Sequence, residues 1–152
     1  MISPELLRRY PFFASLGDVQ QREIASVAEE VFCEKGITLF EEGQPVRMLH
    51  FLLEGSVDLY YAGSANPRDQ FLICEISPGE PFGISALIEP PQAFTATARV
   101  AAPSRVLKID AARLRILFDA DSRLGYALMQ QVAKVALERL HFARLRLATA
   151  RV

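Results

Sequence analysis

The sequence predicts an α+β, mainly β domain: an antiparallel β-roll, also called a double-stranded β-helix or jelly roll, with helices at both ends. Three observations predict it. Helical spacing covers the first thirty residues, short β-rich runs separated by turn residues fill 32–110, and 122–152 has helical spacing without a proline. Strands that reverse about every ten positions are typical of antiparallel sandwiches and barrels. We therefore expect a single domain over 1–152, with helices in 4–31, the roll in 32–110 and helices in 111–150.

Two helical patterns are expected at the N-terminus. The run PELLRRY begins at Pro4, which suits a first helical turn because the missing N–H needs no partner there. The apolar residues of 18–31 fall near helical spacing, which predicts a longer helix. Asp18 followed three residues later by Gln21 matches a capping box, in which each side chain binds a free amide of the first turn.

The middle of the chain alternates strands with turns. The β-rich runs are VFCEK, ITLF, MLHFLLE, SVDLYYA, QFLICEI, FTATARV and SRVLKID. Four glycines fall between or beside these runs, where we expect the chain to turn, because glycine adopts a positive φ without steric cost. They are Gly36, Gly43, Gly55 and Gly79.

Two helices are expected after 110. AARLRILFDAD reads as a short helix, and a long helix follows with Asp121 or Ser122 as its N-cap. Part of its apolar surface is expected to cover the roll, and the rest should be exposed unless a second chain covers it. We therefore expect a homodimer through this helix. Its candidate contact residues are Leu124, Leu128, Val132, Val135, Leu140 and Leu147.

Charge and hydropathy exclude several classes of partner. Apolar residues make up 51% and charged residues 23% of a chain with a net charge of −1, which indicates a globular domain and argues against nucleic-acid binding. No apolar run approaches the ~20 residues of a membrane span, and no signal peptide is evident, so a cytoplasmic location is expected. The chain ends at Val152 with the long helix, so no helix-turn-helix domain is expected.

The residue types that carry chemistry are scattered. Cys33 and Cys74 lie apart and are expected to be buried thiols, and His50 and His141 show no metal-ligand spacing. There is no nucleophile–base pair and no phosphate loop followed by lysine, so we expect neither an enzyme nor a bound metal or cofactor. Four arginines near the C-terminus are expected to form a solvated helix face, with a weak contact to an acidic partner as the alternative. They are Arg139, Arg144, Arg146 and Arg151.

Four short motifs, in order, carry a resemblance to a known family. They are PFFASL at 11–16, EKGITLFEEG at 34–43, LHFLLEGSVDLY at 49–60 and SPGEPFG at 77–83. Together they resemble the cyclic nucleotide-binding domain of catabolite activator-type regulators, kinase regulatory subunits and gated channels. The resemblance covers about residues 6 to 145 and implies the β-roll with a phosphate-binding cassette after its last glycine turn.

The cassette departs from the family pattern at two positions. The family reads Phe-Gly-Glu-Leu/Ile-Ala/Ser-Leu and later Arg-x-Ala-Thr/Ser-Val, where the glutamate binds the ribose 2′-hydroxyl and the arginine pairs with the phosphate. Ile84 stands at the glutamate position and Phe94 at the arginine position. Moving Arg99 into the phosphate role would break the strand register. The cassette positions are Phe82, Gly83, Ile84, Ser85, Ala86, Leu87, Phe94, Thr95 and Ala96.

The resemblance therefore implies a regulatory module with weak or no binding of cAMP or cGMP. Ile84 and Phe94 are expected to fill the space and close the pocket, which would leave a dimerisation adaptor for an unidentified protein partner. The alternative is a pocket suited to a different, more apolar small ligand, since ligand sites are mostly apolar with few polar groups.

Overall fold

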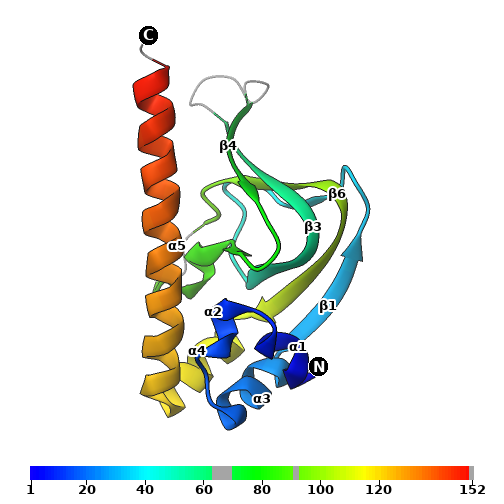
Figure 1. Cartoon of the computed structure of the whole chain (residues 1–152), viewed down its shortest axis with the longest axis vertical. Coiled ribbons are helices and arrows are strands. Elements are labelled where there is room, and N and C mark those ends of the chain that lie inside the picture. Colours follow the sequence, from blue (N-terminus) through cyan, green and yellow to red (C-terminus); the bar gives the residue numbers. More distant parts are fainter. Residues whose placement is uncertain (63–69, 91–92, 151–152) are drawn as a thin grey trace.

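The computed structural model describes residues 1–62, 70–90 and 93–150. Three short helices lie at one end, the strands curl into a roll, and one long helix runs along the side of the whole molecule (Figure 1). The predicted α+β architecture is confirmed. Within the described ranges, no helix is both long and apolar enough to cross a membrane.

The N-terminal helices are α1 (Pro4–Arg8), α2 (Pro11–Ala14) and α3 (Asp18–Ser26). The predicted capping box of α3 is wrong by one residue. Gly17 is the N-cap, and its N–H donates to Oε1 of Gln20 over 3.1 Å. Gln21 is buried instead, where its amide donates to the Phe13 carbonyl over 3.2 Å. The side chain of Gln21 therefore connects α3 to α2 and does not cap α3.

The predicted helix over 18–31 is also too long. α3 ends at Ser26, and strand β1 (Ala28–Cys33) begins two residues later. β1 pairs antiparallel with strand β6 (Thr97–Asp110), from Ala28 opposite Ile109 to Cys33 opposite Ser104. The helical spacing of apolar residues in 27–31 is thus overridden by a partner strand far away in the sequence, as tertiary context commonly does.

The remaining strands are β2 (Thr38–Phe40), β3 (Met48–Ala62), β4 (Gln70–Ile76) and β5 (Pro81–Phe82). All pairings in the sheet are antiparallel, in the order β1-β6-β3-β4, with β2 on β6 and β5 on β3. Two pairs of predicted strands are continuous. MLHFLLE and SVDLYYA form β3, and SRVLKID joins most of FTATARV in β6.

Gly55 therefore does not lie at a turn between strands, contrary to the prediction. It lies inside β3, with a φ of 100°, where the register against β6 shifts on both sides. Such irregularities bend a strand, and this one lets a long two-stranded ribbon curl into a roll. The predicted turns at Gly36, Gly43 and Gly79 are confirmed, each with a positive φ of 86° to 94°.

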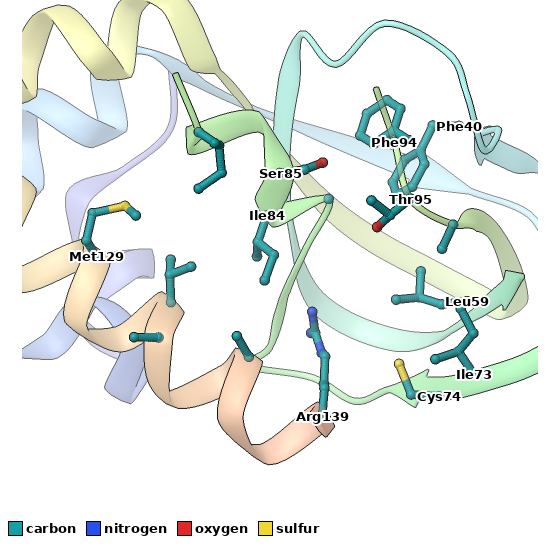
Figure 2. Close-up of a pocket in the computed structure, with 16 residues that line it drawn as sticks. Phe40, Leu59, Ile73, Cys74, Ile84, Ser85, Phe94, Thr95, Met129 and Arg139 are labelled. Carbon is teal, nitrogen blue, oxygen red and sulfur yellow. The ribbon is translucent and has the colours of Figure 1, made fainter. Parts of the chain in front are cut away.

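The C-terminal helices are α4 (Ala111–Ala120) and α5 (Ser122–Thr149). Asp121 caps α5, as predicted, by accepting from the amides of Arg123 and Leu124. Leu124, Leu128 and Val132 are buried in the core of their own domain, so these three cannot form a dimer contact as predicted. This face of α5 closes the side of the roll, beside the cavity drawn in Figure 2.

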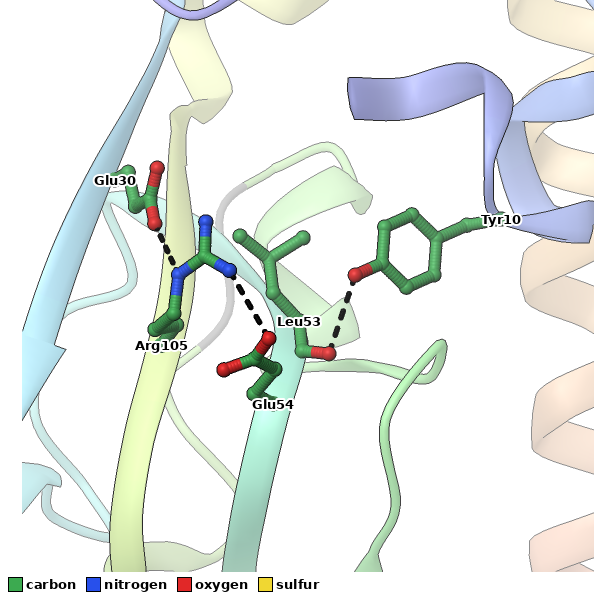
Figure 3. A network of polar contacts seen from close by, with 5 residues as sticks. All are labelled: Tyr10, Glu30, Leu53, Glu54 and Arg105. Carbon is green, nitrogen blue, oxygen red and sulfur yellow. Dashed lines mark hydrogen bonds and ion pairs between the residues drawn. The ribbon is translucent and has the colours of Figure 1, made fainter. Parts of the chain in front are cut away.

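A polar network fastens the bent part of the roll (Figure 3). Arg105 of β6 pairs with Glu30 of β1 and, over 3.1 Å, with Glu54 of β3. Tyr10 donates its hydroxyl to the carbonyl of Leu53 over 3.2 Å, which connects β3 to the N-terminal helices. The arginine thereby holds three strands together at the bend next to Gly55.

Candidate functional site

A cavity of about 510 Å³ lies between the cassette turn, the roll and α5 (Figure 2). The prediction that Ile84 and Phe94 fill this space is wrong, because both line an existing cavity. Its lining is mostly apolar. The lining residues are Phe40, Leu59, Ile73, Cys74, Gly83, Ile84, Ser85, Ile88, Phe94, Thr95, Ala96, Met129, Val132, Ala133, Ala136 and Arg139.

The cassette turn follows β5. Gly83 has a φ of 66° and leads into a single 3₁₀ turn, η1 (Ile84–Leu87). A Cβ atom on Gly83 would lie 3.2 Å from the ring of Phe94 and 3.4 Å from Nδ1 of His50, so both the conformation and the close approach favour glycine. The amide of Ala86 donates to the Gly83 carbonyl over 3.1 Å. The amide of Ala86 is therefore already paired inside the turn.

Phe94 explains why the cavity stays open. Its ring stacks on Phe40, with 3.8 Å between centroids and 14° between planes, and only 6% of the residue is exposed. Its backbone is also fixed, since its amide donates to the Gln44 carbonyl over 3.0 Å and its carbonyl accepts from Gly43 over 2.9 Å. The ring therefore forms a wall of the cavity and does not project across it.

Six of the nine predicted cassette residues line the cavity. Phe82, Ala86 and Leu87 are instead buried in the core behind it. Arg99 does not line the cavity, as expected. Its guanidinium lies 5.2 Å from the centre of the Tyr60 ring and donates to Gln70 over 3.3 Å.

Arg139 is the residue that the sequence reading missed. The prediction of a solvated helix face is wrong for this side chain, which is 18% exposed and points from α5 toward the cavity (Figure 2). Burial lowers the pKa of its guanidinium. The signal was its spacing, because Arg139 lies seven residues, or two helical turns, after Val132, which is buried against the roll. Farther along, Arg146 donates to the carbonyls of Leu72 and Ile73 over 2.9 and 2.7 Å.

The cysteines behave differently from each other. Cys33 is buried as predicted, whereas Cys74 is half-buried and lines the cavity. Desolvation raises the pKa of both thiols. Across the described residues, no group of three or more His, Cys, Asp and Glu side chains could hold a metal ion.

His50 lies behind the cassette turn among aromatic rings. It is 3% exposed, its ring centroid lies 5.1 Å from those of Phe40 and Phe82, and its Nδ1 is buried without a hydrogen-bond partner. Burial, aided by the charge of Lys108, lowers its pKa to about 4. The imidazole is therefore neutral at pH 7 and serves as part of the packing behind the site.

We expect acid to destabilise the domain through His50. Because its pKa is below the value of about 6.5 in the unfolded chain, the unfolded state binds the proton first as the pH falls. Stability is then lost between about pH 6.5 and pH 4, and the loss at pH 5 relative to pH 7.5 is about 2 kcal/mol. Urea unfolding of wild type and His50→Phe over this range measures it. Parallel pH profiles for the two chains would contradict the assignment.

Comparison with known proteins agrees with this geometry. The family model of the cyclic nucleotide-binding domain matches residues 30–121. A crystal structure from Geobacter metallireducens GS-15, described as that of a candidate cyclic nucleotide-binding protein, is 42% identical, has a TM-score of 0.81, and covers 93% of this chain and 100% of its own. The N-terminal domain of a transcriptional regulator from Streptomyces coelicolor A3(2) is 29% identical, with a TM-score of 0.68 and coverage of 91% and 94%.

A candidate potassium channel protein from Rhodopseudomonas palustris is 24% identical over 132 residues, which is 87% of this chain. The chain spans only 31% of the length of that channel protein. The family match covers more than half of the chain, and the Geobacter structure matches nearly all of it. The matched domains are regulatory sensor domains, which are typically non-catalytic. This chain belongs to the cyclic nucleotide-binding domain family.

Proposed function

We propose that the chain is a non-enzymatic regulatory sensor whose cavity accepts a ligand more apolar than a cyclic nucleotide, and that it binds cAMP and cGMP weakly or not at all. One observation carries the proposal: the cavity is open, and the side chains at the two cassette positions that line it are Ile84 and Phe94. A dimerisation adaptor with a closed pocket fits less well, because the space is open.

The two replaced side chains remove the charged partners of a cyclic nucleotide. A hydrogen bond to a charged group contributes roughly 1.5–3 kcal/mol. Losing both the glutamate and the arginine of the family pattern therefore costs about 3–6 kcal/mol, or about 10² to 10⁴ in affinity. The hydroxyls of Ser85 and Thr95 remain at the cavity wall, but they are neutral. A family member with a Kd of about 1 µM would thus have a Kd of about 0.1 to 10 mM.

A thermal-shift titration with cAMP and cGMP tests this proposal. A ligand that binds only the native state stabilises it by RT ln(1 + [L]/Kd), and the melting temperature rises accordingly. At 1 mM of either nucleotide a Kd of about 1 µM would add about 4 kcal/mol, whereas a Kd of about 0.1 to 10 mM adds about 1.4 kcal/mol or less, so we expect only a small shift for wild type. A rise in melting temperature that corresponds to about 4 kcal/mol would overturn the proposal.

We also propose that the chain forms a homodimer through α5. The C-terminal half of α5 carries exposed large apolar side chains at spacings of three and seven residues, which are the spacings of a helix pair. Leu140 is 47% exposed, Leu137 66% and Leu147 64%. Apolar side chains exposed in such a row usually mark an interface. We call Leu137, Leu140 and Leu147 the outer stripe of α5.

Leu140→Asp is expected to reduce the mass in solution from a dimer to the 16.9 kDa monomer, because it places a charge in the middle of the outer stripe. Light scattering measures the mass. Leu145→Asp is the matched control, since Leu145 is an exposed leucine of the same helix outside this stripe. It should leave the mass of the dimer unchanged. A monomeric wild type, or equal masses for wild type and Leu140→Asp, would exclude this interface.

A further inference from the structure

Arg139 is the one charged side chain among the described residues that line the cavity. Its guanidinium is incompletely paired. Nη2 donates to the carbonyl of Pro81, the nearest carboxylate oxygen is that of Glu80 at 4.0 Å, and Nε is buried without a hydrogen-bond partner. A charge held away from water is stabilised by a close opposite charge, and here that charge lies at the limit of ion-pair distance.

The rest of the cavity near Arg139 is apolar. Ile84 faces it from the cassette turn, and the Phe40–Phe94 stack forms another wall of the cavity (Figure 2). On α5, Ala133 and Ala136 lie on the two turns before the arginine and leave room because their side chains are small. The volume of about 510 Å³ falls within the range of small-molecule sites.

We propose that this cavity binds an amphipathic organic anion, with one carboxylate beside Arg139 and an apolar body against Ile84, Phe94 and the alanines of α5. The inference rests on the proposed sensor function and names its ligand class. Arginine pairs with carboxylates through two parallel hydrogen bonds, which are stronger than neutral ones. A cyclic nucleotide carries the same single charge, but its one free ribose hydroxyl, the 2′-hydroxyl, would meet Ile84, which has no hydrogen-bonding group. The lining therefore favours a carboxylate with an apolar body.

The ligand would also contact the helix that carries the outer stripe. Arg139 and Leu140 are neighbours on α5, and the arginine already connects this helix to the start of β5 through Pro81. A carboxylate that binds the guanidinium competes with Pro81 and Glu80 for the same donors. Ligand binding is thereby coupled to the contact between α5 and the roll.

Isothermal titration of the full chain with two acids and their neutral counterparts tests the proposal. The probes are octanoate and 3-phenylpropionate, with octanamide and 3-phenylpropanamide as uncharged molecules of the same shape. We expect at least one acid to bind wild type about tenfold or more tightly than its amide. Arg139→Gln should weaken that acid about tenfold or more and leave the amide unchanged, whereas Arg139→Lys, which keeps the charge, should lie between.

A second pair of variants keeps the test independent of the folding of Arg139→Gln. Ala136 is exposed on α5 one turn before Arg139 and lines the cavity. Ala136→Glu should occupy the arginine with a carboxylate of the protein and abolish acid binding. Ala136→Gln, of the same size without the charge, should weaken the acid and the amide alike and keep the ratio of their affinities, because it takes up volume without pairing with Arg139. Thermal unfolding of each variant verifies that it is folded.

A wrong ligand class and a wrong proposed function give different results in these titrations. If neither acid binds, if acid and amide bind wild type equally, or if Arg139→Gln retains the preference, the ligand class is wrong. Binding of the amides alone would leave the apolar sensor standing. A parallel titration with cAMP tests the proposed function separately. A micromolar affinity for cAMP would overturn the proposed function, whether or not Arg139→Gln removes that affinity.

Discussion

Gly55→Ala is expected to destabilise the domain by about 3–5 kcal/mol, combining the cost of a positive φ with that of overpacking. A Cβ atom at this position would lie 2.2 Å from Oγ of Ser104 and 2.6 Å from the carbonyl oxygen of Pro103. The backbone cannot easily withdraw, because Glu54 pairs with Arg105, and Ser104 accepts from the amide of Ser56 over 3.1 Å. For a domain of this size the melting temperature should fall by about 10 °C or more.

Gly36→Ala is the matched control for this prediction. Gly36 has nearly the same backbone conformation, with a φ of 94°, but an added Cβ would meet no atom within 4 Å. Gly36→Ala should therefore lower the stability only by the cost of the positive φ, about 1–3 kcal/mol. Differential scanning calorimetry of both variants separates the two contributions. Equal melting temperatures would mean that the close approach of β6 to Gly55 adds no free-energy cost to the substitution.

The double variant Ile84→Glu, Phe94→Arg is expected to bind cAMP about 10² to 10⁴ times more tightly than wild type, because it restores both charged groups of the family pattern. The backbone around them is already shaped for the cassette, with the positive φ of Gly83 leading into the η1 turn. Both changes are made together, since Ile84→Glu alone would place a carboxylate in the cavity that Arg139 lines. Titration calorimetry with cAMP measures the gain.

The single variant Phe94→Arg and the neutral change Phe94→Met are the controls. Both lose the stack on Phe40, so both unliganded chains should unfold at a lower temperature than wild type. Only the arginine adds a partner for the phosphate, so Phe94→Arg alone should gain about 10- to 100-fold in affinity and Phe94→Met nothing. A double variant that binds cAMP no better than wild type would show that the cavity excludes the nucleotide by its shape.

Several features of this fold follow from short-range patterns in the chain. Proline in a first turn, Asp121 before the long helix and the glycines of tight turns act through neighbouring backbone groups, so the sequence predicts them directly. The succession of helices, antiparallel strands and a long helix follows from hydrophobic spacing in the same way. The chemistry of the cassette is also local, because Ile84 and Phe94 are apolar wherever they point.

Other features depend on distant partners and are decided only by the tertiary structure. The segment 28–31 is a strand because β6 lies beside it, and Gly55 bends a strand because Ser104 passes within contact distance. Phe94 leaves the cavity open because its ring stacks on Phe40. Arg139 looks like a surface arginine in the sequence, and it becomes the single charge of the described cavity lining because α5 docks with this face on the roll. Burial and cavity shape belong to pairs of elements that meet in space, so no single segment encodes them.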